Sequence, residues 1–354
     1  MRPRLSAEAG QSSLEWLGIG AIAVGLVLAL VTAAPVMGES IVERFRCLLQ
    51  SATSLVTGAD PGSCAGAGDG STNQGGAEVP ERTPLEHATQ GDYIAIGDSF
   101  SSGEGAGEYG ESDCHRSPNG YPSLIADTHA FGGDVINVTC SGARIEHVNG
   151  ADGQHGEGPQ IDAITGDASL ITIGISGNDT GWTDVVSSCA TGGSIGGDIC
   201  GDTAAVRANM DAAIEQFDAL LQEIMSTDHD ARVIALGYPR FFPDPPEESW
   251  TYGCNPFGCL ARISVEDQAW MNELFRDYND ALAEVAATNG VEFVDVHDAF
   301  TGCELTTSGG CMNGLVLDGG FRWPPVSANP GSFHPNAQGQ QALADLLLQQ
   351  IENP

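Results

Sequence analysis

Short apolar segments alternate with longer amphipathic ones after residue 91, and this alternation constrains the fold more than any other feature. The apolar segments resemble strands that are buried on both faces of a sheet. The segments between them have helical periodicity, with apolar residues at three- to four-residue spacing. This alternation predicts a parallel sheet with helices on both faces. The predicted strands are 92–97, 135–138, 170–175, 232–237 and 291–296, and the predicted helices are 203–226, 264–288 and 337–351.

Polar motifs follow the first three predicted strands and precede the last helix. The chain reads Gly-Asp-Ser at 97–99, Cys-Ser-Gly at 140–142, Ser-Gly-Asn at 176–178 and Gly-Ser-Phe-His at 331–334. Sites in parallel sheets form beyond the carboxyl ends of the strands, so we expect these motifs to meet there.

The residue types in these motifs suit nucleophilic catalysis. A Ser at a strand-to-helix turn lies where backbone N–H groups favour negative charge, and a His elsewhere can take its proton. A Gly N–H and an Asn side chain can stabilise an oxyanion. The residues by themselves therefore indicate a hydroxyl nucleophile with a His base.

In this order, the motifs resemble those of the SGNH hydrolases, also called GDSL esterases and lipases. The resemblance covers about residues 92–348 and implies an α/β fold: a flavodoxin-like three-layer α/β/α sandwich with a five-stranded parallel sheet. It places the nucleophile on Ser99 and the base on His334, with oxyanion donors at the N–H groups of Ser99 and Gly142 and at the Asn178 side chain. The segments closest to the secreted bacterial branch are 97–107, 114–117, 140–143 and 293–300.

One residue departs from the family pattern. Many members carry an Asp three residues before the catalytic His, and this chain has Gly331 there. An imidazole base needs a partner on its other nitrogen to fix its tautomer and orientation. We expect a main-chain carbonyl at or next to Gly331, with Gly331 as the first candidate, to orient His334, which gives a dyad rather than a triad. A carboxylate from Asp295, Asp298 or Asp318 is the alternative.

The charge of the chain excludes two classes of partner. Its 13 cationic side chains are all Arg and face 48 acidic ones, a net charge of −35. Binding to nucleic acid requires a basic footprint, and anionic lipid attracts basic segments. We therefore expect no nucleic-acid partner and no electrostatic docking on anionic membranes.

The ten cysteines are an even number, which favours disulfides in an oxidising compartment. A zinc site made by the last four is the alternative. The spacing around His297 suits no common zinc pattern, so we expect no metal and no cofactor. We expect disulfides between Cys47 and Cys64, between Cys114 and Cys140 and between Cys189 and Cys200. We expect the last four cysteines, Cys254, Cys259, Cys303 and Cys311, to form two bridges among themselves.

An uncharged run of 23 residues at 16–38 is long enough to span a membrane. Arg2 and Arg4 precede it and predict a cytoplasmic N-terminus with the remainder outside the cell. The residues around Gly10 and Glu15 resemble the processing site of type IV pilin-like precursors of the Flp/TadE kind, in which the cut follows the Gly. That resemblance implies a prepilin peptidase and pilin-like subunits as partners. A plain uncleaved anchor and a removed signal peptide are the alternatives.

The composition divides the chain into an anchor helix with its extension at 1–57, a flexible Gly/Ser/Asp-rich linker at 58–88 and a hydrolase domain at 89–354. The leading function is a carboxylic ester hydrolase for a small-molecule or lipid ester, displayed outside the cell membrane or released from it. One alternative is an O-deacetylase of cell-envelope carbohydrate with the same machinery. Another is a non-catalytic, pilus-associated adhesion protein on a hydrolase fold.

Overall fold

The computed structural model describes residues 82–192, 200, 203–254, 259, 261–305, 310–316 and 329–354. They belong to one unit, Val79–Pro354, which is separate from Met1–Glu78. The predicted anchor and most of the predicted linker lie outside the described residues.

The centre of the unit is a five-stranded parallel sheet in the order β2-β1-β3-β4-β7. This is the flavodoxin-like order of doubly wound sheets. Every residue of the central strand β3 is buried, as its mostly apolar sequence predicts. All five predicted strands are present, with small shifts in their bounds. They are β1 (Asp92–Gly97), β2 (Val135–Asn137), β3 (Ala168–Gly174), β4 (Arg232–Leu236) and β7 (Glu292–Val294).

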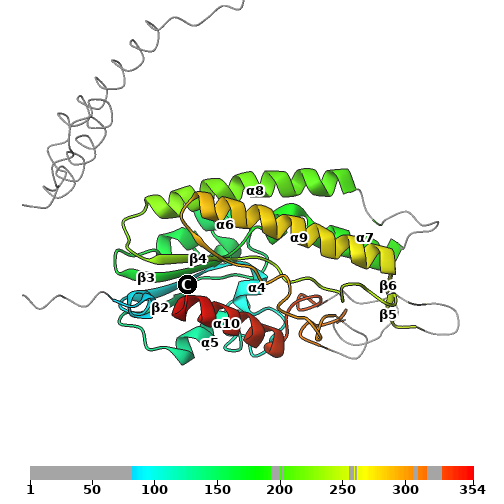
Figure 1. The fold of residues 1–354 in the computed structure, drawn as a ribbon, viewed down its shortest axis with the longest axis horizontal. Coiled ribbons are helices and arrows are strands. Elements are labelled where there is room, and N and C mark those ends of the chain that lie inside the picture. Colours follow the sequence, from blue (N-terminus) through cyan, green and yellow to red (C-terminus); the bar gives the residue numbers. More distant parts are fainter. Residues whose placement is uncertain are drawn as a thin grey trace, which may run out of the picture. The chain divides into compact units, whose positions relative to one another are not determined.

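Helices cover both faces of the sheet and make the three predicted layers (Figure 1). One face carries α3 (Pro84–Ala88), α5 (Tyr121–Thr128) and α10 (Ala337–Glu352). The other carries α6 (Ile145–Asn149), α8 (Thr203–Ser226) and α9 (Val265–Thr288). The shorter elements are α4 (Ser99–Ser102), α7 (Trp182–Gly192) and the 3-10 turns η1 (Gln154–Gly156), η2 (Gln160–Ala163) and η3 (Gly177–Thr180).

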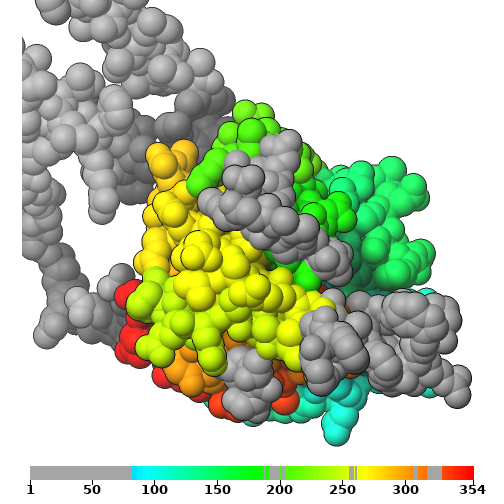
Figure 2. All heavy atoms as spheres, turned by 90° about the vertical axis from the view of Figure 1, so that its right-hand side faces the viewer, coloured from blue at the N-terminus to red at the C-terminus, as the bar shows by residue number. Residues whose placement is uncertain are grey.

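A second, antiparallel sheet consists of β5 (Trp250–Tyr252) and β6 (Ala261–Ile263), which the sequence did not predict. These strands are three residues long and lack the apolar run that marks the main sheet. Figure 2 shows the end of the unit where they lie, with the yellow-green and yellow part of the chain in the middle of the surface.

The folded unit begins earlier than the predicted boundary at residue 89. Thr83 and Glu86 form a capping box that starts α3, and Ala88 at its end is fully buried. The Arg232 side chain on β4 donates a hydrogen bond at 3.2 Å to the Pro84 carbonyl. A short capped helix therefore packs on the unit at 84–88, where the composition indicated only a spacer.

The described part of the chain contains four disulfides: Cys114–Cys140, Cys189–Cys200, Cys254–Cys259 and Cys303–Cys311. The last two leave none of their four sulfurs as a thiolate for the zinc site considered above. Cys47 and Cys64 lie outside the described residues.

None of the helices in the described ranges combines the length and the apolar character of a membrane span. The predicted span at 16–38 lies outside those ranges.

Candidate active site

The turn after β1 presents Ser99 at the first position of α4. Asp98 caps this turn by accepting a hydrogen bond at 2.9 Å from the Phe100 N–H. Gly97 packs so closely on β3 that a Cβ there would lie 2.5 Å from the Gly174 carbonyl oxygen. The Gly-Asp-Ser sequence thus satisfies packing and capping, and it places the 5% exposed Ser99 at the carboxyl edge of the sheet.

His334 reaches the same edge from the loop before α10. Its Nε2 lies 2.8 Å from the Ser99 Oγ, and its Nδ1 lies 2.9 Å from the Ser332 carbonyl oxygen. A carbonyl only accepts, so Nδ1 carries the proton and Nε2 accepts the hydroxyl hydrogen of Ser99. The fold thereby joins two side chains that are 235 residues apart in sequence.

The carbonyl that orients His334 belongs to Ser332, the residue next to Gly331, and not to Gly331 itself. Phe333 has a φ of 58°, in the left-handed region, and turns the His334 ring back toward the carbonyl two residues earlier. The Gly331 carbonyl instead accepts a hydrogen bond at 3.2 Å from the Asn313 side chain. A main-chain carbonyl nevertheless occupies the place of the missing Asp.

Among the described residues, no carboxylate hydrogen-bonds to His334. Asp295 and Asp298, which follow β7, bond to other groups. Burial lowers the pKa of His334 from its usual 6.5, against the opposing effects of the Ser332 carbonyl and the Glu104 charge. A lowered pKa keeps the imidazole neutral near pH 7, which is the form that a base requires.

Gly142 and Asn178 come from the loops after β2 and β3, and they border the same cavity as Ser99 and His334. The Asn178 Nδ2 donates a hydrogen bond at 2.8 Å to the Ala143 carbonyl, which fixes the amide between the two loops. Gly142 has a φ of 79°, a conformation that favours glycine. The four residues predicted to form the site therefore all border one cavity.

This cavity has a volume of about 570 Å³, and most of its wall is apolar. Trp182 and Val186 of α7, Met210 of α8, Phe275 of α9 and Phe241 contribute to the wall. The Trp182 and Phe275 rings pack edge to face with centroids 4.1 Å apart. Such a wall suits an acyl chain better than a hydrated sugar.

Asn313 holds the His334 loop against the loop after α4, and no sequence pattern marked it. Its side-chain amide donates to the Gly105 carbonyl at 2.8 Å and to the Gly331 carbonyl at 3.2 Å. Its backbone N–H donates to the His334 carbonyl at 2.9 Å. An Asn followed by a Gly is typical of any turn, so its role became visible only when the fold brought the two loops together.

The Cys114–Cys140 disulfide joins two segments of the site. Cys140 lies two residues before Gly142, and the Ser141 N–H donates to the Cys114 carbonyl at 3.0 Å. The disulfide therefore fixes the Gly142 loop to the polar loop after α4.

Glu104 and His115 anchor that polar loop. The His115 Nδ1 lies 2.6 Å from the buried Glu104 carboxylate, and the Tyr109 hydroxyl donates to the same carboxylate at 3.1 Å. The rings of Tyr109 and His115 stack with centroids 4.7 Å apart. These contacts make Glu104 a structural residue of the loop.

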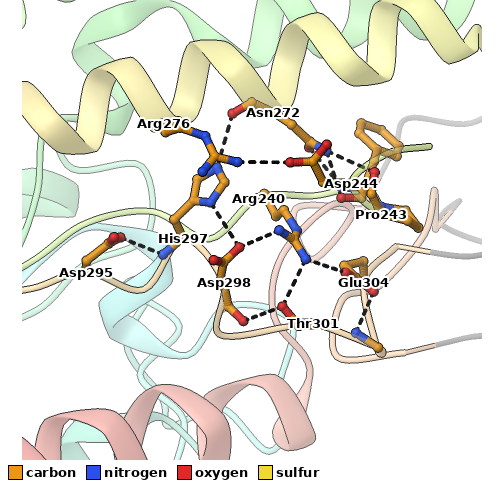
Figure 3. Close-up of polar contacts among 12 residues, drawn as sticks. Arg240, Pro243, Asp244, Asn272, Arg276, Asp295, His297, Asp298, Thr301 and Glu304 are labelled. Carbon is orange, nitrogen blue, oxygen red and sulfur yellow. Dashed lines mark hydrogen bonds and ion pairs between the residues drawn. The ribbon is translucent and has the colours of Figure 1, made fainter.

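His297 belongs to a polar network with Asp298 and Arg240 (Figure 3). Its Nε2 is 3.1 Å from the Asn272 carbonyl oxygen. Arg240 lies between Asp298 and Glu304 and forms ion pairs with both, at 3.0 Å for Glu304. No group of metal-binding side chains occurs in the described part of the chain. The network instead anchors the segment that follows β4.

Comparison with known proteins identifies similar chains. The sequence profile of the GDSL-like Lipase/Acylhydrolase family matches residues 95–342. A lipase of Streptomyces rimosus is 33% identical over 269 residues, which cover 75% of this chain and 87% of that protein. Lipase 1 of Streptomyces coelicolor is 30% identical over 252 residues, 70% of this chain and 82% of its own.

Two solved structures share the fold. The extracellular lipase from Streptomyces rimosus superposes with a TM-score of 0.55 at 29% identity. The phospholipase A1 from Streptomyces albidoflavus NA297 does so with a TM-score of 0.55 at 26% identity. Each match covers 73% of this chain and 99% of the other.

Proposed function

Because the chain belongs to the GDSL-like lipase/acylhydrolase family and is an ester-hydrolysing enzyme, we propose that it cleaves carboxylic esters through an acyl-enzyme on Ser99. The observation that carries this proposal is the 2.8 Å contact between the His334 Nε2 and the Ser99 Oγ. The Ser332 carbonyl supports it, since it holds the imidazole in the tautomer that can accept the hydroxyl proton.

In the proposed reaction, the Ser99 Oγ attacks the ester carbonyl carbon while the His334 Nε2 takes its proton. The N–H groups of Ser99 and Gly142 and the Asn178 amide stabilise the oxyanion. The proton then passes from Nε2 to the departing alcohol, which leaves the acyl group on Ser99. Water, activated by the same imidazole, releases the acid and restores the serine.

The apolar cavity beside Ser99 supports an ester with an extended acyl chain as the substrate. The cavity of about 570 Å³ offers room for several methylene groups. It gives no specific support to the carbohydrate O-deacetylase, whose acetyl group needs little space. The Ser99–His334 contact counts against the non-catalytic adhesion protein.

Replacing the nucleophile or the base tests this function directly. Ser99→Ala and His334→Ala should each lower kcat for p-nitrophenyl butyrate about 10⁴-fold or more, because a nucleophile and its base act as a unit. Ser169→Ala is the matched control, since Ser169 is a buried, hydrogen-bonded serine of β3. Near-native turnover by Ser99→Ala would refute the proposed function.

Acyl-chain preference tests the assignment of the cavity. We expect kcat/KM for p-nitrophenyl esters to rise from acetate to octanoate by up to about fourfold per methylene, since a buried CH₂ contributes about 0.8 kcal/mol. Ala190→Leu narrows the cavity from α7 and should reduce turnover of octanoate more than that of acetate. A clear preference for acetate in the unmodified protein would favour the O-deacetylase instead.

We also propose that the hydrolase unit is displayed outside the cell by the segment at 16–38. The uncharged length of this segment and the preceding Arg2 and Arg4 support that orientation. Gly10 and Glu15 support processing by a prepilin peptidase and association with pilin-like subunits.

Cell fractionation tests this display. The full chain should sediment with membranes, and a chain without residues 1–57 should remain soluble and active. Mass spectrometry of the mature protein should find an N-terminus at Gln11 if the pilin-like cut occurs. A mature N-terminus beyond residue 38 would show a removed signal peptide and contradict the anchor.

A further inference from the structure

One hydroxyl group connects the turn that carries Ser99 with the turn that carries Asn178. Tyr238 follows β4, and its side chain is 3% exposed. Its hydroxyl donates a hydrogen bond at 2.7 Å to the Asp98 Oδ2 and accepts one at 2.7 Å from the Gly177 N–H. Asp98 directly precedes Ser99, and Gly177 directly precedes Asn178. The two hydrogen-bond partners of the phenol are therefore the residues directly before the nucleophile and the oxyanion donor.

The Gly177 turn is shaped around this phenol. A Cβ at Gly177 would lie 2.9 Å from the Tyr238 Cε1 and Cζ, so only glycine lets the backbone come this close. Ser176 has a φ of 105°, which is unusual for a residue with a side chain. Its Oγ accepts a hydrogen bond at 2.7 Å from the Tyr278 hydroxyl. Two buried tyrosines thus hold a turn that its own backbone preferences do not favour.

Tyr238 is itself held rigidly. The Asn279 side chain accepts from the Tyr238 N–H at 2.8 Å and donates to the Tyr238 carbonyl at 2.8 Å. The Phe100 ring packs edge to face on the phenol, with centroids 5.5 Å apart. Two residues later, Arg240 is fixed by the network of Figure 3. The hydroxyl therefore acts as a fixed point for the two turns.

We propose that Tyr238 is a positioning residue, whose hydroxyl keeps the Asn178 amide aligned with Ser99 for the ester hydrolysis proposed above. An oxyanion donor is effective only when it is already aimed at the developing charge, because reorientation during the reaction costs free energy. Loss of the hydroxyl removes its hydrogen bonds to the Gly177 N–H and to Asp98 and frees the strained turn. The inference rests on the proposed function and adds a residue to it.

The pH dependence gives this alignment a distinct signature. Burial raises the pKa of Asp98 to about 7, while the hydrogen bonds from Tyr238 and Phe100 lower it. Asp179, Tyr121 and Tyr278 are the other titratable groups that interact with Asp98. The carboxylate accepts the phenol hydrogen above about pH 7, and its protonation below that pH weakens the link.

The Tyr238→Phe substitution should shift the pKa of Asp98 in a defined direction. Tyr238→Phe removes a hydrogen bond that favours the Asp98 carboxylate, so the pKa of Asp98 rises further. The pH at which activity falls on the acid side should therefore move upward. Burial shifts the pKa of His334 downward, in the opposite direction to that of Asp98.

The experiment compares Tyr238→Phe with Tyr93→Phe in the full-length protein. Tyr93 is the matched control, since its fully buried hydroxyl lies 3.0 Å from the Thr172 Oγ1 on the same sheet, away from the cavity. We expect Tyr238→Phe to lower kcat for p-nitrophenyl butyrate about tenfold or more, short of the 10²–10³ expected when Asn178→Ala removes the donor itself. KM should change less than about threefold, and the acid limb of kcat/KM should move to higher pH.

Tyr93→Phe should keep kcat and the pH profile of the unmodified protein. The inference is wrong if Tyr238→Phe keeps kcat within about twofold, or if the two variants lose kcat equally. If Tyr238→Phe does not fold, Asp98→Asn replaces it, and the inflection near pH 7 should disappear from its profile. An unchanged inflection would overturn the inference. Ser99→Ala distinguishes a failure of this inference from a failure of the proposed function. If Ser99→Ala kept its activity, the proposed function itself would be refuted.

Discussion

Parallel pairing of β1 with β3 is the constraint on which the site depends. The two strands pair along their length and end together, with Gly97 opposite Gly174. Their side chains are almost completely buried on both faces of the sheet, so a slip of register would disrupt close packing on both faces. The chain turns at the same level after both strands, and this places Ser99 beside the Asn178 turn. The absence of a side chain at Gly97 lets the first turn pack closely on the second strand.

The His base depends on a different constraint, the path of the loop before α10. A carbonyl is neutral, so it stabilises a protonated imidazole less than a carboxylate does. Burial also disfavours the protonated imidazole, and it lowers the pKa of His334. The site is thus arranged to keep the base neutral, and the Asn313 contacts hold its loop in place.

The sequence was sufficient to predict the five strands of the main sheet, because apolar runs identify strands that are buried on both faces. The residues alone indicated a hydroxyl nucleophile and a His base near the carboxyl ends of the strands. The pairing of Ser99 with His334 came from the resemblance to the SGNH hydrolases. The sequence did not distinguish Ser332 from Gly331, because the left-handed conformation of Phe333 decides which carbonyl faces the ring. Tyr238 is an aromatic residue after a buried strand, which is typical of a core position, so its two hydrogen bonds were invisible in the sequence.

Covalent trapping of the nucleophile tests the central claim most directly. A p-nitrophenyl alkylphosphonate reacts with an activated serine to give a stable adduct that resembles the tetrahedral intermediate. The account predicts release of about one p-nitrophenol per chain, loss of activity in proportion, and an adduct that peptide mass spectrometry places on Ser99. An inactivated protein whose adduct lies on another residue, such as Ser101 or Ser141, would contradict it.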